Sequence, residues 1–316
     1  MKLYQSILLT LNYASYFHSQ PTLAELHRFL ISPRPVGLSS IQKSVIKNQL
    51  KLLSSHSIPK SQKQKLRHAT RLARFLSIFP SVTLVALTGS LALDKAKKND
   101  DIDIFIVTKP HTLWLTRLLV VPLVSLFSKR RHPSSVSRRV EPNKDRICFN
   151  LWLDQTALAV PKNQRNLYTA HEVLQIKPLL DRGQTYARFI IVNSWTRKYL
   201  ANAYQYVTSM ASSSVIPSAS SVIPSEVEGS LPAGRQGLRV TPNSEGFLHA
   251  PHRLAGFGRN DKWWKFFFAL PNLLAFKLQY GYMKKKITRE VITLHSAYFH
   301  PRDLSTAIEN YLDQKM

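Results

Sequence analysis

Two apolar runs separated by a polar stretch place the strongest constraint on the fold of this chain. The first run, residues 82–87, contains several β-branched residues and stops at Gly89-Ser90, which is typical of a buried strand that enters a turn. The second run, residues 102–107, is preceded by Asp101 and includes Asp103. Side chains on a strand alternate between its two faces, so the two aspartates share one face. The sequence therefore predicts two strands, with paired carboxylates where the second one begins.

The residue types in this stretch suit a site for a cation and a phosphate group. Two carboxylates held on one face repel each other unless a positive charge lies between them, and oxygen ligands suit Mg²⁺. Gly89 lets the backbone approach a phosphate closely, and the Ser90 hydroxyl and neighbouring N–H groups can donate hydrogen bonds to it. An ordinary polar turn followed by an Asp-x-Asp strand edge is the alternative. The combination at this spacing is rarer than either part, which favours the functional interpretation.

Gly89-Ser90, ten intervening residues and then Asp101-x-Asp103 resemble the signature of the DNA polymerase β-like nucleotidyltransferase superfamily. The resemblance covers residues 60–155. It implies an α+β fold, in which a small mixed sheet with flanking helices carries additional N-terminal and C-terminal helical regions. It also implies that Gly89 and Ser90 bind the nucleotide, and that Asp101 and Asp103 are catalytic residues that bind two Mg²⁺ ions.

The resemblance implies an enzymatic activity as well. Superfamily members transfer a nucleoside monophosphate from an NTP to a hydroxyl group in a Mg²⁺-dependent reaction that releases pyrophosphate. Their acceptors include nucleic acids, small molecules and proteins, and this sequence does not indicate which of these applies. The alternative is a catalytically impaired regulatory protein that binds a nucleotide or a nucleic acid.

A third predicted strand, residues 147–153, bears on that alternative. Most superfamily members carry a third carboxylate on a neighbouring strand of this kind. Here the middle of the strand holds Asn150, which cannot act as a base. Asp154 lies at the end of the strand and shares its alternation with Cys148, Asn150 and Trp152. Asp154 is therefore a weaker candidate for a third metal ligand.

Composition and periodicity divide the chain into five regions. They are residues 1–58, a helical module; 59–160, the nucleotidyltransferase core; 161–210, a helical region; 211–261, a low-complexity insertion; and 262–316, a C-terminal helical region. The first module resembles a winged-helix unit, although a helical module that packs on the core is the favoured interpretation. Residues 213–218 recur as residues 220–225 within Ser-, Pro- and Gly-rich sequence, which predicts a disordered insertion without a catalytic role.

Two further helices are predicted outside the core. Residues 168–180 have apolar positions at helical spacing, and His171 within them is interpreted as structural, with a nucleotide contact left open. Residues 263–286 form an aromatic stretch with basic flanks. We expect the second helix to pack against the helices of residues 189–205, with a membrane-surface helix as the alternative.

The charge of the chain favours anionic partners. The formal net charge is +26, which attracts nucleic acids, nucleotides or anionic membrane surfaces without choosing among them. The hydrophobic content of 44% is typical of a globular protein. The apolar residues 113–127 are too few to span a membrane. The single cysteine, Cys148, fits the reducing cytoplasm, where we expect the protein.

Overall fold

A six-stranded mixed sheet organises the computed structural model, which describes residues 2–53, 59–127, 146–213, 261–287, 290–299 and 304–315. The strands are β1 (Val82–Leu87), β2 (Ile102–Thr108), β3 (Ile147–Asp154), β4 (Lys177–Asp181), β5 (Val291–Ile292) and β6 (Ser296–Tyr298). Their order in the sheet is β4-β1-β2-β3-β6-β5. Only the β2–β3 pair is parallel among these strands. This mixed sheet with flanking helices confirms the expected α+β fold.

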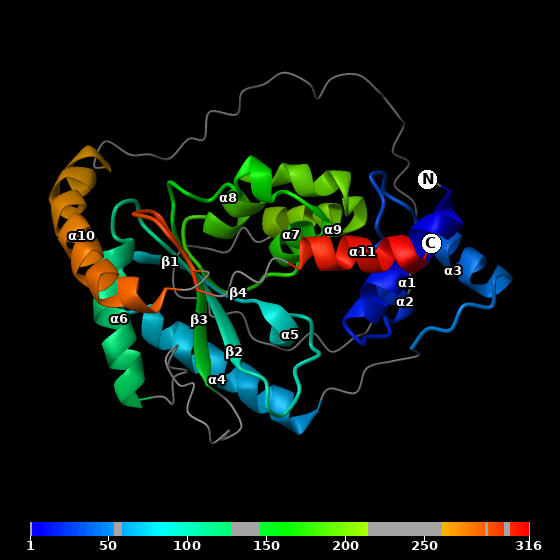
Figure 1. The fold of residues 1–316 in the computed structure, drawn as a ribbon, viewed down its shortest axis with the longest axis horizontal. Coiled ribbons are helices and arrows are strands. Elements are labelled where there is room, and N and C mark those ends of the chain that lie inside the picture. The colour runs from blue at the N-terminus through cyan, green and yellow to red at the C-terminus, as the bar shows by residue number, and fades with distance from the viewer. Residues whose placement is uncertain are drawn as a thin grey trace.

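Helices cover both faces of the sheet (Figure 1). They are α1 (Leu3–Tyr16), α2 (Leu23–Arg28), α3 (Leu38–Lys47), α4 (Lys60–Leu76), α5 (Gly89–Ala92), α6 (Leu113–Phe127), α7 (Leu167–Leu174), α8 (Thr185–Val192), α9 (Ala201–Ser213), α10 (Asp261–Met283) and α11 (Ser305–Lys315). Three short 3₁₀ helices lie among these elements in the described part of the chain, at Lys162–Gln164, Ser194–Lys198 and Lys284–Lys286. None of the helices in the described ranges is long and apolar enough to cross a membrane.

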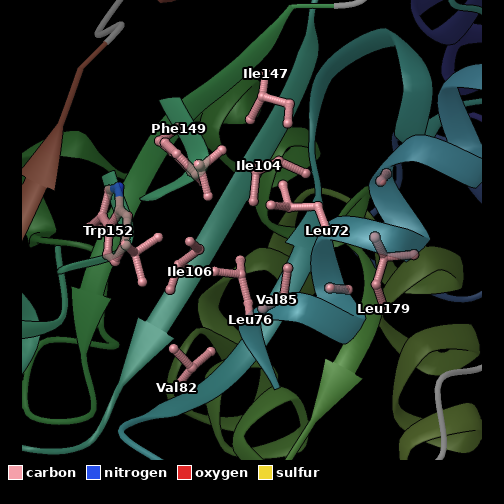
Figure 2. Packing of buried hydrophobic residues seen from close by; sticks show 14 of the residues in the cluster. Leu72, Leu76, Val82, Val85, Ile104, Ile106, Ile147, Phe149, Trp152 and Leu179 are labelled. Carbon is pink, nitrogen blue, oxygen red and sulfur yellow. The ribbon is translucent and has the colours of Figure 1, made fainter. Parts of the chain in front are cut away.

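Alternation along β2 separates two hydrophobic cores. Ile104 and Ile106 face the first core, where α4 contributes Leu72 and Leu76, as Figure 2 shows. Helices α6 and α10 complete this first face. Phe105 faces the second core, which is built from α1, α7, α8, α9 and α11. Because Asp103 has the same parity as Phe105, it belongs to the second face.

Two predicted helical regions also supply strands. Residues 168–180 were expected to form one helix, but α7 ends at Leu174 and residues 177–181 form β4, which pairs antiparallel with β1. Likewise, residues 291–298 form the β5–β6 hairpin. Short apolar runs are ambiguous between helix and strand. Here both segments form strands because they pair with the edges of the sheet, β4 with β1 and β6 with β3.

The expected packing of residues 263–286 against the helices of residues 189–205 is wrong, because α10 packs against α6 (Figure 1). The buried Asn272 accepts hydrogen bonds from the backbone N–H groups of Trp114 (2.8 Å) and Leu115 (3.2 Å), so it caps the first turn of α6. Gln279 donates to the carbonyl of Trp114 at 2.7 Å. These polar residues of α10 thus hydrogen-bond to the backbone of α6 and join the two helices.

The N-terminal helices pack on the second face. Tyr13 of α1 stacks on His171 of α7, with ring centroids 4.0 Å apart. Lys95, in the connection between α5 and β2, forms an ion pair with Glu25 of α2 at 3.0 Å. The lysines of the third helical segment, Lys43 and Lys47, are exposed. Of the predicted insertion at 211–261, residues 214–260 lie outside the described residues.

Asn272 provides a test of this interface. We expect Asn272→Ala to lower the free energy of unfolding by about 2 kcal/mol, because two N–H groups at the start of α6 lose their buried acceptor. Urea unfolding followed by circular dichroism measures the change. Lys277→Ala, at an exposed position of the same helix, is the matched control and should leave stability within about 0.5 kcal/mol. Equal effects of the two substitutions would contradict the capping role.

Candidate active site

The turn after β1 brings a glycine against a carboxylate. The backbone N–H of Thr88 donates to the carbonyl of Asp103 at 3.1 Å, which continues the pairing of β1 with β2. Gly89 follows with a φ of +63°, in the left-handed region that favours glycine. A Cβ atom at Gly89 would lie 2.7 Å from Oδ2 of Asp103. The Asp103 carboxylate and the Gly89 backbone are therefore in close contact, and a side chain at position 89 would force the carboxylate to move.

Ser90 is held by a residue that the sequence analysis did not select. Its hydroxyl donates to Oδ2 of Asp100 at 2.8 Å, and the same oxygen accepts the backbone N–H of Lys97 at 2.9 Å. The ammonium group of the fully buried Lys65, on α4, donates to the Asp100 carbonyl at 2.5 Å. Asp100 therefore fixes the connection between α5 and β2. Its position directly before Asp101 was the available sequence signal.

The structure brings the four primary candidates together at one end of β1 and β2. Gly89 and Ser90 begin α5, while Asp101 directly precedes β2 and Asp103 is its second residue. The hydroxyl of Thr88 is buried in this turn and has no hydrogen-bond partner among the described residues. Two carboxylates beside a glycine turn and a buried hydroxyl form an oxygen-rich donor set, which fits Mg²⁺ and a phosphate group. Asp101 and Asp103 are the residues that would hold the metal.

A third carboxylate interacts electrostatically with Asp103, and the sequence analysis did not identify it. Glu172, on α7, is partly buried. Desolvation, together with the negative charge of Asp103, raises the pKa of Glu172 from 4.5 to about 7. Helix α7, which packs on the second face of the sheet, therefore carries an acidic group within electrostatic reach of Asp103. An acidic residue in a mainly apolar helix was the sequence signal for it.

His171, next to Glu172, packs between helices. Its ring stacks on Tyr13, and Nδ1 lies 3.1 Å from Nε2 of Gln175. Burial lowers the pKa of His171 from 6.5 to about 3, so the imidazole is neutral at physiological pH. This contact agrees with the structural interpretation of His171. It also fixes α7 against α1 and thereby sets the position of Glu172.

Strand β3 does not bring a carboxylate to the aspartate pair. Its residue opposite Asp103 is Cys148. The register then shifts between Phe149 and Leu151, so Asn150 is the extra residue of a bulge. Asn150 and Trp152 were expected to share one face of the strand, but the bulge breaks this alternation. Trp152 packs in the first core together with Phe149, three residues earlier.

Asp154 lies apart from the other candidates. It pairs with Thr108, five residues beyond Asp103 along β2. At the usual rise per residue, this places it about 16 Å from Asp103. Asp154 contacts His111 and His295 instead, with a distance of 2.7 Å between its Oδ2 and Nδ1 of His295. In this arrangement Asp154 cannot share a metal ion with Asp101 and Asp103.

Comparison with known families agrees with this geometry. Residues 70–155 match the family model described as a nucleotidyltransferase domain, which spans α4 through β3 and includes Gly89, Ser90, Asp101 and Asp103. Comparisons with curated proteins and with solved structures gave no match. Over residues 70–155 the chain is therefore similar to a nucleotidyltransferase domain, which supports the resemblance to the DNA polymerase β-like superfamily.

Proposed function

We propose that this protein is a Mg²⁺-dependent enzyme that transfers a nucleoside monophosphate from an NTP to a hydroxyl acceptor and releases pyrophosphate. The observation that carries the proposal is the contact between Gly89 and Asp103. It joins a turn suited to phosphate with a carboxylate suited to Mg²⁺ at one point. The match of residues 70–155 to the nucleotidyltransferase domain supports transfer chemistry in general.

Each group at the site has an assigned task in this proposal. Backbone N–H groups at Gly89 and Ser90 bind the phosphates of the NTP, because glycine leaves room for a close approach. Asp101 and Asp103 hold the metal. Bound Mg²⁺ supplies the positive charge that neutralises the phosphates and the leaving pyrophosphate. Positioning the acceptor hydroxyl in line with the bond to be broken supplies much of the remaining rate.

The transfer step also requires a proton acceptor. The acceptor's hydroxyl oxygen forms a bond to the α-phosphorus, the bond from that phosphorus to pyrophosphate breaks, and the hydroxyl proton leaves. We assign this proton to Glu172, the third carboxylate beside Asp103. A base is most effective when its pKa lies near the working pH, and the pKa of Glu172 is about 7 in the metal-free protein.

The exposed basic charge of α4 favours an anionic acceptor. Helix α4, which bonds to the Asp100 carbonyl through Lys65, exposes the basic side chains of Lys63, Arg67, Arg71 and Arg74. Together with the net charge of +26, this face suits a nucleic-acid acceptor held by its phosphates. We place the protein, as an NTP-dependent enzyme of this kind, in the cytoplasm.

The first prediction from this proposal concerns the aspartate pair. In assays of Mg²⁺-dependent pyrophosphate release with tRNA, with single-stranded DNA or with no acceptor, Asp101→Ala/Asp103→Ala should reduce turnover by about 100-fold or more. The exposed Asp313→Ala is the control and should retain full activity. Mg²⁺-dependent nucleotide binding without turnover in the wild-type protein would instead favour the regulatory alternative.

The second prediction concerns the contact between Gly89 and Asp103. Gly89→Ala forces a Cβ into the position of the carboxylate and strains the left-handed backbone, so we expect nucleotide affinity in the presence of Mg²⁺ to fall at least about tenfold. Isothermal titration calorimetry with a non-hydrolysable NTP measures the affinity. Gly281→Ala is the matched control, because a Cβ there meets nothing within 4 Å. If Gly89→Ala kept the wild-type affinity for the nucleotide, the proposed phosphate-binding role of this turn would be refuted.

The third prediction separates the function of Glu172 from stability. We expect Glu172→Gln to reduce turnover by about 100-fold, because the proton acceptor is lost. In the metal-free protein the folded-state pKa of about 7 exceeds the ordinary value of 4.5, so wild-type stability falls as pH rises from 4.5 through 7. At pH 8 the variant should therefore be more stable than wild type by on the order of 2 kcal/mol.

The stability difference should vanish at pH 4, where wild-type Glu172 is protonated in both states. Urea unfolding in EDTA at the two pH values measures it. Glu309→Gln, an exposed change on α11, is the control for both readouts. If Glu172→Gln retained wild-type turnover, the assignment of the proton to this residue would be wrong.

A further inference from the structure

Two histidines and an aspartate form a cluster far from the aspartate pair. His111, Asp154 and His295 each offer one potential ligand atom, and these atoms lie within 4.8 Å of one another. His111 lies in the turn after β2, Asp154 ends β3, and His295 lies in the connection between β5 and β6. We propose that these three residues bind a Zn²⁺ ion that ties the C-terminal hairpin to the nucleotidyltransferase domain.

The carboxylate of Asp154 is fully buried and fixed in orientation. Its Oδ1 accepts hydrogen bonds from the backbone N–H of Thr156 at 2.8 Å and from the Thr156 hydroxyl at 2.5 Å. Its Oδ2 points at the histidines and accepts the backbone N–H of His111 at 3.2 Å. The backbone N–H of Asp154 donates to the His295 carbonyl at 3.0 Å. One oxygen is thus anchored within the protein, while the other is directed at the cluster.

The two imidazole rings lie near Oδ2 of Asp154. Nδ1 of His295 lies 2.7 Å from Oδ2 of Asp154, and the rings of His111 and His295 lie edge to face with centroids 5.3 Å apart. Ligand atoms on tetrahedral Zn²⁺ are about 3.4 Å apart, so the ion replaces the proton between Nδ1 and Oδ2 and the pair opens by about 0.7 Å. The His295 side chain is 35% exposed, which leaves room for this movement and for a water as fourth ligand.

The donor set selects the kind of metal. Two imidazole nitrogens and one carboxylate oxygen suit Zn²⁺ and related transition metals. Mg²⁺ prefers oxygen ligands and retains several waters, so it is not expected to bind here. The Thr156 hydrogen bonds to Oδ1 supply the outer support that orients a metal-binding carboxylate. The cluster therefore differs in chemistry from the Asp101–Asp103 pair.

The position of the cluster indicates a structural role for the metal. His111 and Asp154 belong to the segment that matches the nucleotidyltransferase domain, whereas His295 comes from the far C-terminal part of the chain. The indole N–H of Trp114 also donates to this connection, at the carbonyls of Thr293 (3.0 Å) and Leu294 (3.1 Å). A bound Zn²⁺ would join three segments that are distant in sequence, which stabilises the folded state relative to the unfolded one.

Zn²⁺ binding to the full-length, tag-free and metal-free protein tests the proposal. We expect calorimetry with ZnCl₂ to show one ion per chain and an increase in the unfolding midpoint. His111→Ala/His295→Ala should weaken the affinity at least about 100-fold. His68→Ala, at an exposed position on α4, and Asp101→Ala/Asp103→Ala should retain the wild-type Zn²⁺ affinity. Unchanged affinity in the double histidine variant would overturn the proposal, as would the same loss in His68→Ala.

A second measurement uses only the wild-type protein, so it does not depend on how the variants fold. Diethyl pyrocarbonate modifies accessible imidazoles, and peptide mass spectrometry locates the modified residues. One equivalent of Zn²⁺ should protect His111 and His295 but not His68, whereas MgCl₂ should protect none of the three. Equal modification of His111 and His295 with and without Zn²⁺ would refute the site.

Discussion

The contact between Gly89 and Asp103 is the constraint on which the rest of the candidate site depends. It exists because β1 and β2 are antiparallel neighbours, with Leu87 opposite Ile104, so the turn that leaves β1 passes over the start of β2. A Cβ at Gly89 would meet the carboxylate at 2.7 Å. The turn at Gly89 and the carboxylate of Asp103 therefore form one structural unit, and moving either strand would separate them.

The parts of the site that depend on local sequence were predictable. The turn that follows the first apolar run and the strand that carries Asp103 follow from short-range patterns, and the structure contains both features. The superfamily resemblance, carried by the same residues, is confirmed by the match of residues 70–155 to the nucleotidyltransferase domain. The mixed sheet followed from the resemblance, whereas periodicity alone did not reveal that residues 177–181 and 291–298 complete it.

What was missed depends on tertiary structure. The bulge at Asn150 reverses which side chains of β3 face each core, and the pattern of residues 147–154 does not indicate an extra residue of this kind. Asp154 is consequently directed toward His111 and His295, which are far from it in the sequence. In the same way, Asn272 of α10 belongs to the first turn of α6 only because the two helices pack together.

Glu172 shows how the helical additions complete the domain. The superfamily resemblance led us to expect a third carboxylate on a neighbouring strand, but β3 offers Cys148 opposite Asp103. The acidic group beside Asp103 comes instead from α7, which the stacking of His171 on Tyr13 fixes against the N-terminal helix α1. Asp103 therefore interacts with two other segments: the turn at Gly89, through direct contact, and α7, through the charge of Glu172. In the proposed reaction the N-terminal helix α1 thus supports the proton acceptor indirectly, because Tyr13 holds the helix that carries Glu172.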